Sequence, residues 1–355
     1  MKFEAETKAL LRAVTASSKV IASRNVIPVL ECLLLRAEDN TLRLTGTDMD
    51  AEVTATCEAA VSTPGALAVH AEDLRRFLAS LPASSLTYAE VADERLVLRA
   101  GRASASISTF PATDFPTFPV DAAPHEVTGA AEAFAFCEAF ASKGETRYYL
   151  NGVYFSPEAT VSTDGHRMGV AAVKSEIAAI VPINMSRVIK PLLDADGRLF
   201  LGERVWRIEA EGVTAVGKLI DGSFPQWERA LPAQQPMLTA DADDILSALR
   251  TATLDGVAGQ AFLTSGDGSV SIRGEGHGRA TAEAEFRAEI AVAFAGCVNA
   301  KYLQSVLAPL AGSVVETFGA NGTLGFRAVG KPEWVTVCMA YGHPQNAWPE
   351  VRAAA

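Results

Sequence analysis

The sequence predicts an α+β protein in which one unit, made of two helices on small antiparallel sheets, occurs three times in tandem. Its 355 residues exceed what a single hydrophobic core usually supports. Hydrophobic residues make up 49% of the chain and charged residues 21%, which is typical of globular proteins. Three segments share one pattern, in which a short apolar stretch and a polar residue precede a helix. Such repetition indicates tandem copies of one structural unit.

The second helix of the first and third units carries the clearest repeat. Counted from His70 and from Asn299, apolar residues follow at the fourth, seventh, eighth and eleventh positions. This spacing places them on one face of a helix. We therefore expect helices over residues 72–81 and 299–310.

The middle copy of this helix is expected over residues 184–193. The three starting residues are 114 and 115 positions apart, and Asn184 and Asn299 are suitable N-cap residues because their side chains accept hydrogen bonds from the first turn. Pro191 interrupts the middle copy. Since a proline inside a helix removes a backbone hydrogen bond, we expect a kink there or a later helix start.

Each unit also opens with an amphipathic helix, expected over 7–20, 131–143 and 241–252. Alternating segments such as TLRLTGTDMDAEVTATC and RLVLRAGRASASIST predict antiparallel strands with one buried face. The proline-containing links PTFPVDAAPHE and LPAQQPM predict the boundaries. The expected domains are 1–120, 126–232 and 237–345, followed by a tail over 346–355.

The charge balance restricts how this chain could meet nucleic acid. Lys and Arg number 31 against 42 Asp and Glu, which gives a formal charge of −11. An acidic protein does not usually bind DNA over its outer surface, because the phosphate backbone repels it. Any DNA-binding hypothesis therefore requires a local basic surface.

Several features predict a cytoplasmic protein with no membrane contact. The N-terminal residues lack the apolar core of a secretory signal, and no apolar run reaches the length of a membrane span. The five cysteines lie far apart without a CxxC pair, which favours buried thiols in a reducing compartment.

Further motifs recur or stand out along the chain. Thr47-Asp48 and Thr163-Asp164 are 116 positions apart, and Asp114-Phe115-Pro116 precedes Ser223-Phe224-Pro225 by 109. Six motifs resemble the bacterial DNA sliding clamp, the beta subunit of DNA polymerase III: the opening MKF, Arg24 in SRNVIPVL, Gly46-Thr47-Asp48, Asp114-Phe115-Pro116, Arg147-Tyr148-Tyr149-Leu150-Asn151-Gly152 and Thr163-Asp164-Gly165-His166-Arg167-Met168. The resemblance runs in the same order from residue 1 to about Met339.

The resemblance implies a ring of two chains joined head to tail, with their helices lining a hole for double-stranded DNA. Such a clamp would confer processivity on the replicative DNA polymerase. It would bind polymerase and clamp-loader subunits through linear hydrophobic peptides. The alternative is a clamp-fold adaptor that binds peptides and does not retain DNA.

Basic side chains on the expected helices, with two from the motifs, are the candidates for DNA contact. The six helix ranges hold ten basic and seven acidic residues, so the rest of the chain carries the acidic excess. Ordinary solvated helix faces are the alternative interpretation. Glu72 and Asp73 also stand where the family commonly has basic residues. The expected DNA-binding residues are Arg24, Lys8, Arg12, Arg75, Arg76, Arg147, Arg187, Lys190 and Lys301.

The resemblance also implies a pocket for client peptides. A few apolar side chains would form a slot, with polar groups at its rim. A tight Asp-Gly turn and a buried terminal strand are the structural alternatives for the same residues. The expected pocket residues are Leu150, Thr163, Gly165, His166, Arg167, Met168, Pro225, Arg229, Val337 and Met339.

The expected ring interface joins Ala105 and Ile107 to Thr253 and Leu254. Ala105 stands where the family has a large aromatic residue, and Thr253 where it has an aliphatic one. Because aromatic anchors dominate many interfaces, we expect a weaker dimer and a diverged copy of the clamp. Ala230 replaces a larger pocket residue, and the sequence AYGHPQNAWPEVRAAA follows Met339, where the family chain ends.

A hydrolase built around Asp164 and His166 is the third hypothesis. No paired carboxylates, nucleophile elbow or metal-spaced cluster accompanies these residues. The glycine-rich GDGSVSIRGEGHG stretch fits neither a dinucleotide loop nor a phosphate loop. The sequence therefore predicts a non-catalytic protein without cofactor or metal.

Overall fold

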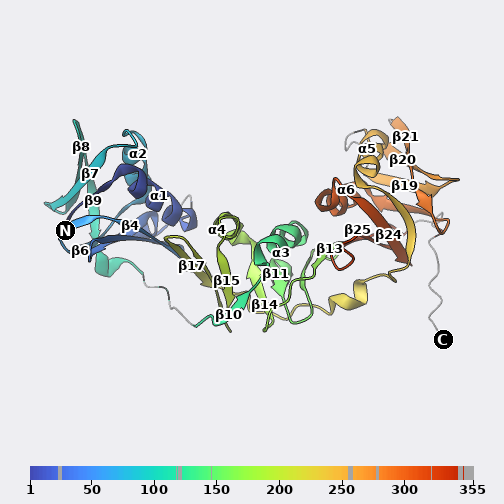
Figure 1. The fold of residues 1–355 in the computed structure, drawn as a ribbon, viewed down its shortest axis with the longest axis horizontal. Coiled ribbons are helices and arrows are strands. Elements are labelled where there is room, and N and C mark those ends of the chain that lie inside the picture. The colour runs from blue at the N-terminus through green and yellow to red at the C-terminus, as the bar shows by residue number, and fades with distance from the viewer. Residues whose placement is uncertain are drawn as a thin grey trace. The chain divides into compact units, whose positions relative to one another are not determined.

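The chain folds into two compact units in the computed structural model, which describes residues 1–22, 26–116, 118, 122–144, 146–254, 259–276, 280–320, 322–342 and 347 (Figure 1). Unit 1 comprises Met1–Ala131 and Asn184–Leu219. Unit 2 comprises Glu132–Ile183 and Ile220–Ala355. Both units combine helices with antiparallel sheets, so the α+β prediction is confirmed. The range expected for a central domain, 126–232, contributes segments to both units.

Unit 1 is built on one antiparallel sheet with the strand order β10-β15-β16-β17-β4-β3-β2-β6-β9-β8-β7-β1-β5. The second chain segment joins the first by pairing β17 with β4, where Val213 lies opposite Ala55 and Gly217 opposite Ala51. The strands are β1 (Lys2–Glu6), β2 (Cys32–Glu38), β3 (Thr41–Thr47), β4 (Ala51–Glu58), β5 (Ala60–Thr63), β6 (Gly65–His70), β7 (Leu86–Ala92), β8 (Arg95–Ala100), β9 (Ala103–Pro111), β10 (His125–Val127), β15 (Arg198–Leu201), β16 (Val205–Ala210) and β17 (Val213–Lys218).

Two helices cover this sheet and close the core of unit 1. Helix α1 (Thr7–Ser17) and helix α2 (Ala71–Ala79) lie side by side. Leu10 of α1 and Leu74 of α2 pack with Leu33 of β2 in one buried cluster. A third helix, α4 (Ser186–Leu193), packs against β16 and the short turn that follows α1.

Unit 2 contains two antiparallel sheets. The larger has the order β14-β11-β12-β13-β26-β25-β24-β18-β22, and the smaller the order β21-β20-β19-β23. The strands are β11 (Gly152–Phe155), β12 (Thr160–Thr163), β13 (Arg167–Ala171), β14 (Ala179–Pro182), β18 (Pro236–Asp241), β19 (Gln260–Ser265), β20 (Ser269–Gly276), β21 (Ala280–Arg287), β22 (Glu289–Ile290), β23 (Ala295–Asn299), β24 (Val314–Ala320), β25 (Thr323–Ala328) and β26 (Val335–Met339).

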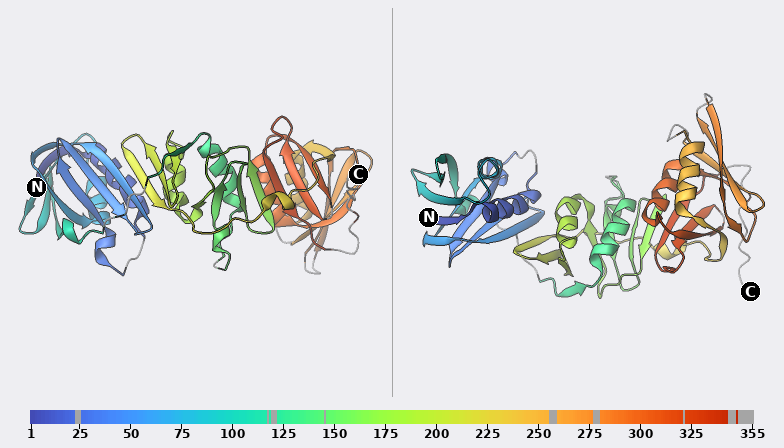
Figure 2. Two further views of the ribbon diagram at one scale, coloured as in Figure 1. Left: turned by 90° about the horizontal axis from the view of Figure 1, so that it is seen from below. Right: turned by 45° about the horizontal axis from the view of Figure 1, so that its top comes forward.

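Helix α3 (Ala130–Cys137) lies mainly in unit 2, together with α5 (Ala242–Ala252) and α6 (Ala300–Leu307). Figure 2 shows α5 beside α6. Their buried faces, with Ile245 and Leu249 from α5 and Leu303 and Val306 from α6, share one core cluster. This is the amphipathic pattern that the sequence predicts.

Most expected helices are present, with differences at their ends. The range 7–20 is α1 followed by a 3₁₀ turn at Ser18–Val20, whereas α3 ends at Cys137 and a 3₁₀ turn at Glu138–Phe140 replaces its last part. The Asn299 side chain accepts from the Lys301 and Tyr302 amides at 2.9 and 3.2 Å, which confirms it as an N-cap.

The middle copy differs because of its proline. Helix α4 starts at Ser186, after a 3₁₀ turn at Ile183–Met185, and Met185 occupies its N-cap position without a side-chain bond. The N-cap prediction for Asn184 was therefore wrong. The later start agrees with the expectation for Pro191, which stays inside the helix. Pro191 removes one N–H donor from the hydrogen-bond ladder of this short helix.

None of the five cysteines, all of which lie in the described part of the chain, forms a disulfide, and all five are buried. Burial raises the pKa of the Cys32 and Cys57 thiols to about 11 in each case, so both remain protonated near neutral pH. Within the described part of the chain, no helix combines the length and apolar character that crossing a membrane requires.

Replacement of Leu33 by Ala tests the core of unit 1. Leu33 on β2 is 0% exposed, and its truncation should cost about 2–5 kcal/mol of the free energy of unfolding through lost burial and a residual cavity. The matched control is Leu86→Ala on β7, because Leu86 is 54% exposed and its loss should change stability by less than about 0.5 kcal/mol. Urea unfolding followed by circular dichroism measures both, and equal costs would contradict the proposed core.

Candidate functional site

A cavity of about 670 Å³ opens on unit 2 beside strands β13 and β26. All ten residues of the expected pocket line it, although they come from four separate parts of the chain. We call this cavity the slot. Nine further residues complete its lining: Arg147, Tyr149, Gln226, Trp227, Ala230, Leu231, Pro232, Ala233 and Thr323.

The floor of the slot is apolar because two strands meet there. Met168 of β13 lies opposite Val337 of β26 in the antiparallel ladder. Leu150, from the 3₁₀ turn Tyr148–Leu150, lies beside them, and each of the three side chains is 3% exposed. A parallel stack of Tyr154 on Phe224, with centroids 4.5 Å apart, belongs to the apolar cluster around this floor. A buried terminal strand and a slot floor are therefore compatible descriptions of Val337.

One wall of the slot is the turn between β12 and β13. Gly165 adopts a φ of +88°, which a side chain would strain. The Asp164 carboxylate accepts from the His166 and Arg167 amides at 2.9 and 2.8 Å, and Arg167 returns two guanidinium bonds to it at 3.0 and 2.7 Å. The Asp-Gly turn is thus present, and it forms part of the slot wall.

Arg167 and His166 also tie this wall to helix α6. Arg167 Nη1 donates to Ser305 Oγ at 2.8 Å, and its guanidinium lies 5.4 Å from the ring centroid of Tyr302. The His166 ring stacks on the same Tyr302 at 5.4 Å. Met339 N donates to His166 O at 2.9 Å and links the wall to the end of β26. The slot is therefore held by contacts from β12, β13, β26 and α6.

The rim of the slot is basic in a chain of net negative charge. Arg147, His166, Arg167 and Arg229 line the cavity, and its described lining contains no carboxylate. Arg147 Nη2 donates to Asp164 O at 3.3 Å, and its side chain is otherwise exposed. This arrangement suits an apolar segment whose polar groups accept hydrogen bonds at the rim.

Sequence reasoning assigned Arg147 to DNA contact, whereas the structure places it at the slot. It also missed Trp227 and Leu231, which lie in the short turn and link after Phe224-Pro225. Two large apolar residues in a proline-containing link are a signal that could have identified them, because such links usually carry polar residues.

The geometry offers no catalytic arrangement at Asp164 and His166. The carboxylate is occupied by two backbone amides and Arg167, and the imidazole stacks on Tyr302. Across the described residues, no group of three or more His, Cys, Asp or Glu has the arrangement of a metal site.

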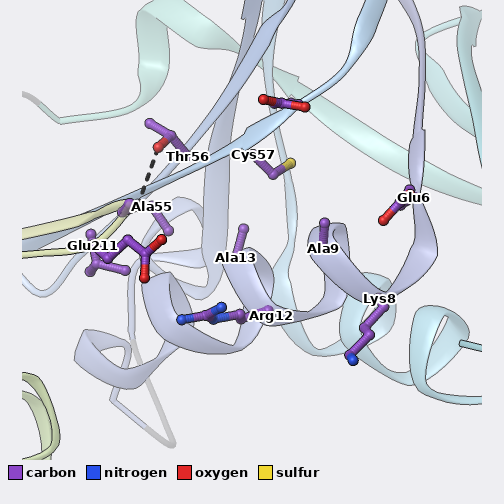
Figure 3. Close-up of a pocket in the computed structure, with 12 residues that line it drawn as sticks. Glu6, Lys8, Ala9, Arg12, Ala13, Ala55, Thr56, Cys57 and Glu211 are labelled. Atoms are coloured by element: carbon purple, nitrogen blue, oxygen red, sulfur yellow. Dashed lines mark hydrogen bonds between the residues drawn. The ribbon is translucent and has the colours of Figure 1, made fainter. Parts of the chain in front are cut away.

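A second cavity, of about 470 Å³, lies in unit 1 between α1 and strand β4 (Figure 3). Lys8 and Arg12 extend from α1, and Glu211 lies in the turn between β16 and β17. Glu6 and Glu58 add two more carboxylates to its lining. The cavity is of mixed charge, so its basic side chains do not form a purely cationic surface.

Several of the other residues expected to contact DNA already interact with other groups of the chain. Arg75 and Arg76 of α2 both bind the Glu72 carboxylate, and Arg187 donates to Val20 O at 3.0 Å. Lys190 lies on α4 and Lys301 on α6. Arg24 is outside the described residues.

The expected interface residues do not all offer side chains to a partner. Ile107 belongs to the core of unit 1, and Thr253 is 3% exposed with its hydroxyl donating to Leu249 O. Leu254, at the end of α5, is 41% exposed, and Ala105 is partly exposed on β9. Any contact through these four positions would therefore depend mainly on Leu254 and Ala105.

Comparison with known proteins identifies the family. Residues 1–119 match the family model for the DNA polymerase III beta subunit N-terminal domain, and residues 131–226 match the model for its central domain. The Beta sliding clamp of Caulobacter vibrioides is 30% identical over 345 residues, covering 89% of this chain and 92% of that protein. The Beta sliding clamp of Escherichia coli is 33% identical over 252 residues, covering 65% and 68%.

Solved structures agree with the sequence matches. The beta subunit of polymerase III from Caulobacter crescentus has a TM-score of 0.89 at 27% identity and covers 96% of this chain and 100% of that chain. A sliding clamp from Pseudomonas aeruginosa, solved bound to griselimycin, has a TM-score of 0.87 at 25% identity, covering 96% and 99%. With two family models, a near full-length relative and the same fold in agreement, this chain belongs to the bacterial beta sliding clamps, the non-catalytic beta subunits of DNA polymerase III.

Proposed function

We propose that this chain is a DNA-encircling processivity factor that binds its clients through the slot of unit 2. The observation that carries the proposal is the meeting of ten residues from four chain segments around one apolar cavity, in a member of the beta sliding clamp family. Two copies would join head to tail and enclose double-stranded DNA. A clamp loader would open the ring, and the polymerase would attach through a linear peptide.

The slot is suited to a short peptide with apolar side chains. Its floor of Leu150, Met168 and Val337 removes apolar groups from water, which supplies most of the affinity in sites of this kind. The rim arginines would fix the backbone and polar groups of the peptide. A sliding clamp of the same fold from Pseudomonas aeruginosa has been solved bound to griselimycin, which supports the view that clamps of this fold bind ligands.

Basic side chains on the helices would face DNA without reading its sequence. Helix α1 carries Lys8 and Arg12 and no acidic residue. Contacts of this type with phosphate are weak and sensitive to salt. Weak contact suits a clamp, because the closed ring would retain the DNA by topology while the protein slides.

A peptide-binding adaptor that does not retain DNA is the second candidate function. Two observations favour it: Arg75 and Arg76 are already bound to Glu72, and Ala105 offers little apolar surface to a partner chain. The two candidates differ in topology, since only a closed ring is trapped on a closed DNA circle.

The domain ranges 1–120, 126–232 and 237–345 belong to the same proposal, and the repeats of the sequence support them. A cytoplasmic location is also proposed. Membership of a family of bacterial replication proteins supports it, as do five buried cysteines that form no disulfide.

Replacement of Met339 by Ala tests the slot. Met339 lines the rim and is half exposed, so its truncation should leave the fold intact and weaken binding of a client-type hydrophobic peptide roughly tenfold. Fluorescence titration measures the dissociation constant, and Leu150→Ala should weaken it as well. Val329→Ala is the matched control, because Val329 is an exposed apolar residue of unit 2 outside the slot. Unchanged affinity in the Met339 variant would contradict a peptide site here.

Retention on circular DNA tests the ring. Loaded onto a nicked plasmid, the protein should stay bound through gel filtration, and it should dissociate once the plasmid is cut to a linear form. Release from both forms at equal rates would favour the adaptor.

Sedimentation velocity tests the dimer. Because Ala105 is small and Thr253 is buried in its own unit, we expect monomer to appear at nanomolar concentration and dimer at micromolar concentration. Leu254→Asp should shift the balance further toward monomer by placing a charge in the interface. A dimer that persists at nanomolar concentration would exclude the weaker association.

A further inference from the structure

Two arginines of helix α2 already form ion pairs with a glutamate of the same helix. Arg75 donates to the Glu72 carboxylate through Nε at 2.7 Å and through Nη2 at 2.9 Å. Arg76 donates through Nε at 2.7 Å to the same carboxylate. Both Glu72 oxygens therefore accept from guanidinium groups, and one side chain holds two cations. We call these three residues the α2 triad.

The α2 triad contributes little to the stability of the helix. Glu72 and Arg75 are each 40% exposed and Arg76 is 72% exposed, so the ion pairs are solvated and contribute only modestly to folding. The hydrogen bond from Arg75 lowers the pKa of Glu72 to about 2, so the carboxylate is ionised at every physiological pH. The carboxylate is therefore present in its charged form, in which it can pair with both arginines.

The chemistry of the triad bears on phosphate binding. Guanidinium groups bind carboxylate and phosphate oxygens with the same paired N–H donors. The Glu72 carboxylate lies three residues before Arg75 and four before Arg76 on the same helix, so it is always within reach of both. A DNA phosphate would have to displace it. Helix α1 packs beside α2 and carries Lys8 and Arg12 without any acidic neighbour on its own helix. The two helices thus differ in whether an acidic residue of the same helix pairs with their cations, while Glu6, Glu58 and Glu211 line the cavity beside Lys8 and Arg12.

We propose that Glu72 pairs with Arg75 and Arg76 in place of DNA phosphate and thereby lowers the affinity of unit 1 for DNA. This inference rests on the proposed DNA-encircling function and adds the residue that sets the strength of contact. The triad carries one net positive charge, against two for the free arginines. A lower affinity would favour sliding along the DNA, because each phosphate contact must break before the protein can move.

The substitution Glu72→Gln tests the proposal with the full-length protein. Duplex affinity is measured by fluorescence anisotropy over a range of salt concentrations. The variant should bind duplex DNA several-fold more tightly at low salt, and the slope of log affinity against log salt should steepen by roughly one to two, as expected for one or two more phosphate contacts. Adding Arg75→Met and Arg76→Met to this variant should cancel the gain.

Asp73→Asn is the matched control. It removes one negative charge from the same turn of α2, but the Asp73 carboxylate lies 3.1 Å from His70 Nδ1 and is not part of the α2 triad. A gain in Glu72→Gln that exceeds the gain in Asp73→Asn supports the proposal. Equal gains, or a gain that survives removal of both arginines, would overturn it, because net charge alone would then explain the effect.

The result separates this inference from the function on which it rests. If Lys8→Met with Arg12→Met weakens binding and plasmid retention is observed while Glu72→Gln has no effect, the clamp function stands and the role of Glu72 is refuted. If the parent protein and every variant fail to bind or retain DNA, the DNA-encircling function itself fails. Far-ultraviolet circular dichroism checks that each variant keeps its helices.

Discussion

Antiparallel pairing between strands far apart in the chain is the constraint on which the rest of this structure depends. In unit 1, β17 joins β4 across about 160 residues, and in unit 2, β26 joins β13 across a similar separation. Buried backbone N–H and C=O groups must be paired, so each ladder fixes both the position and the register of its strands. Because Met168 then lies opposite Val337, the slot floor is a direct product of this pairing.

The polar part of the slot depends on that register as well. The turn at Gly165 can contact α6 only because β13 and β26 bring the two ends of unit 2 together. Arg167 then serves three purposes: it closes the turn through Asp164, binds Ser305 and covers Tyr302. A chain of net charge −11 thereby presents an apolar floor with a basic rim. The local charge of a site is thus set by which side chains the fold gathers, and the total charge of the chain does not reveal it.

The number of basic residues on a helix likewise does not show how many of them can contact phosphate. Counting charges along the expected ranges treats every Lys and Arg as equally available. In the folded chain Arg75 and Arg76 share one carboxylate, Arg187 binds a backbone carbonyl, and Lys8 and Arg12 line a cavity that also holds three carboxylates. Contact with phosphate depends on free donors, and only side-chain geometry shows where those donors are.

The sequence by itself determined the α+β class, the faces of the helices, the cap at Asn299 and the ten slot residues, the last through motifs of a known family. These features depend on local spacing or on short motifs. The tertiary structure alone decided the burial of Ile107 and Thr253, and the place of Arg147, Trp227 and Leu231 at the slot. Each of these depends on where long-range strand pairing leaves a side chain, and no local pattern encodes that direction.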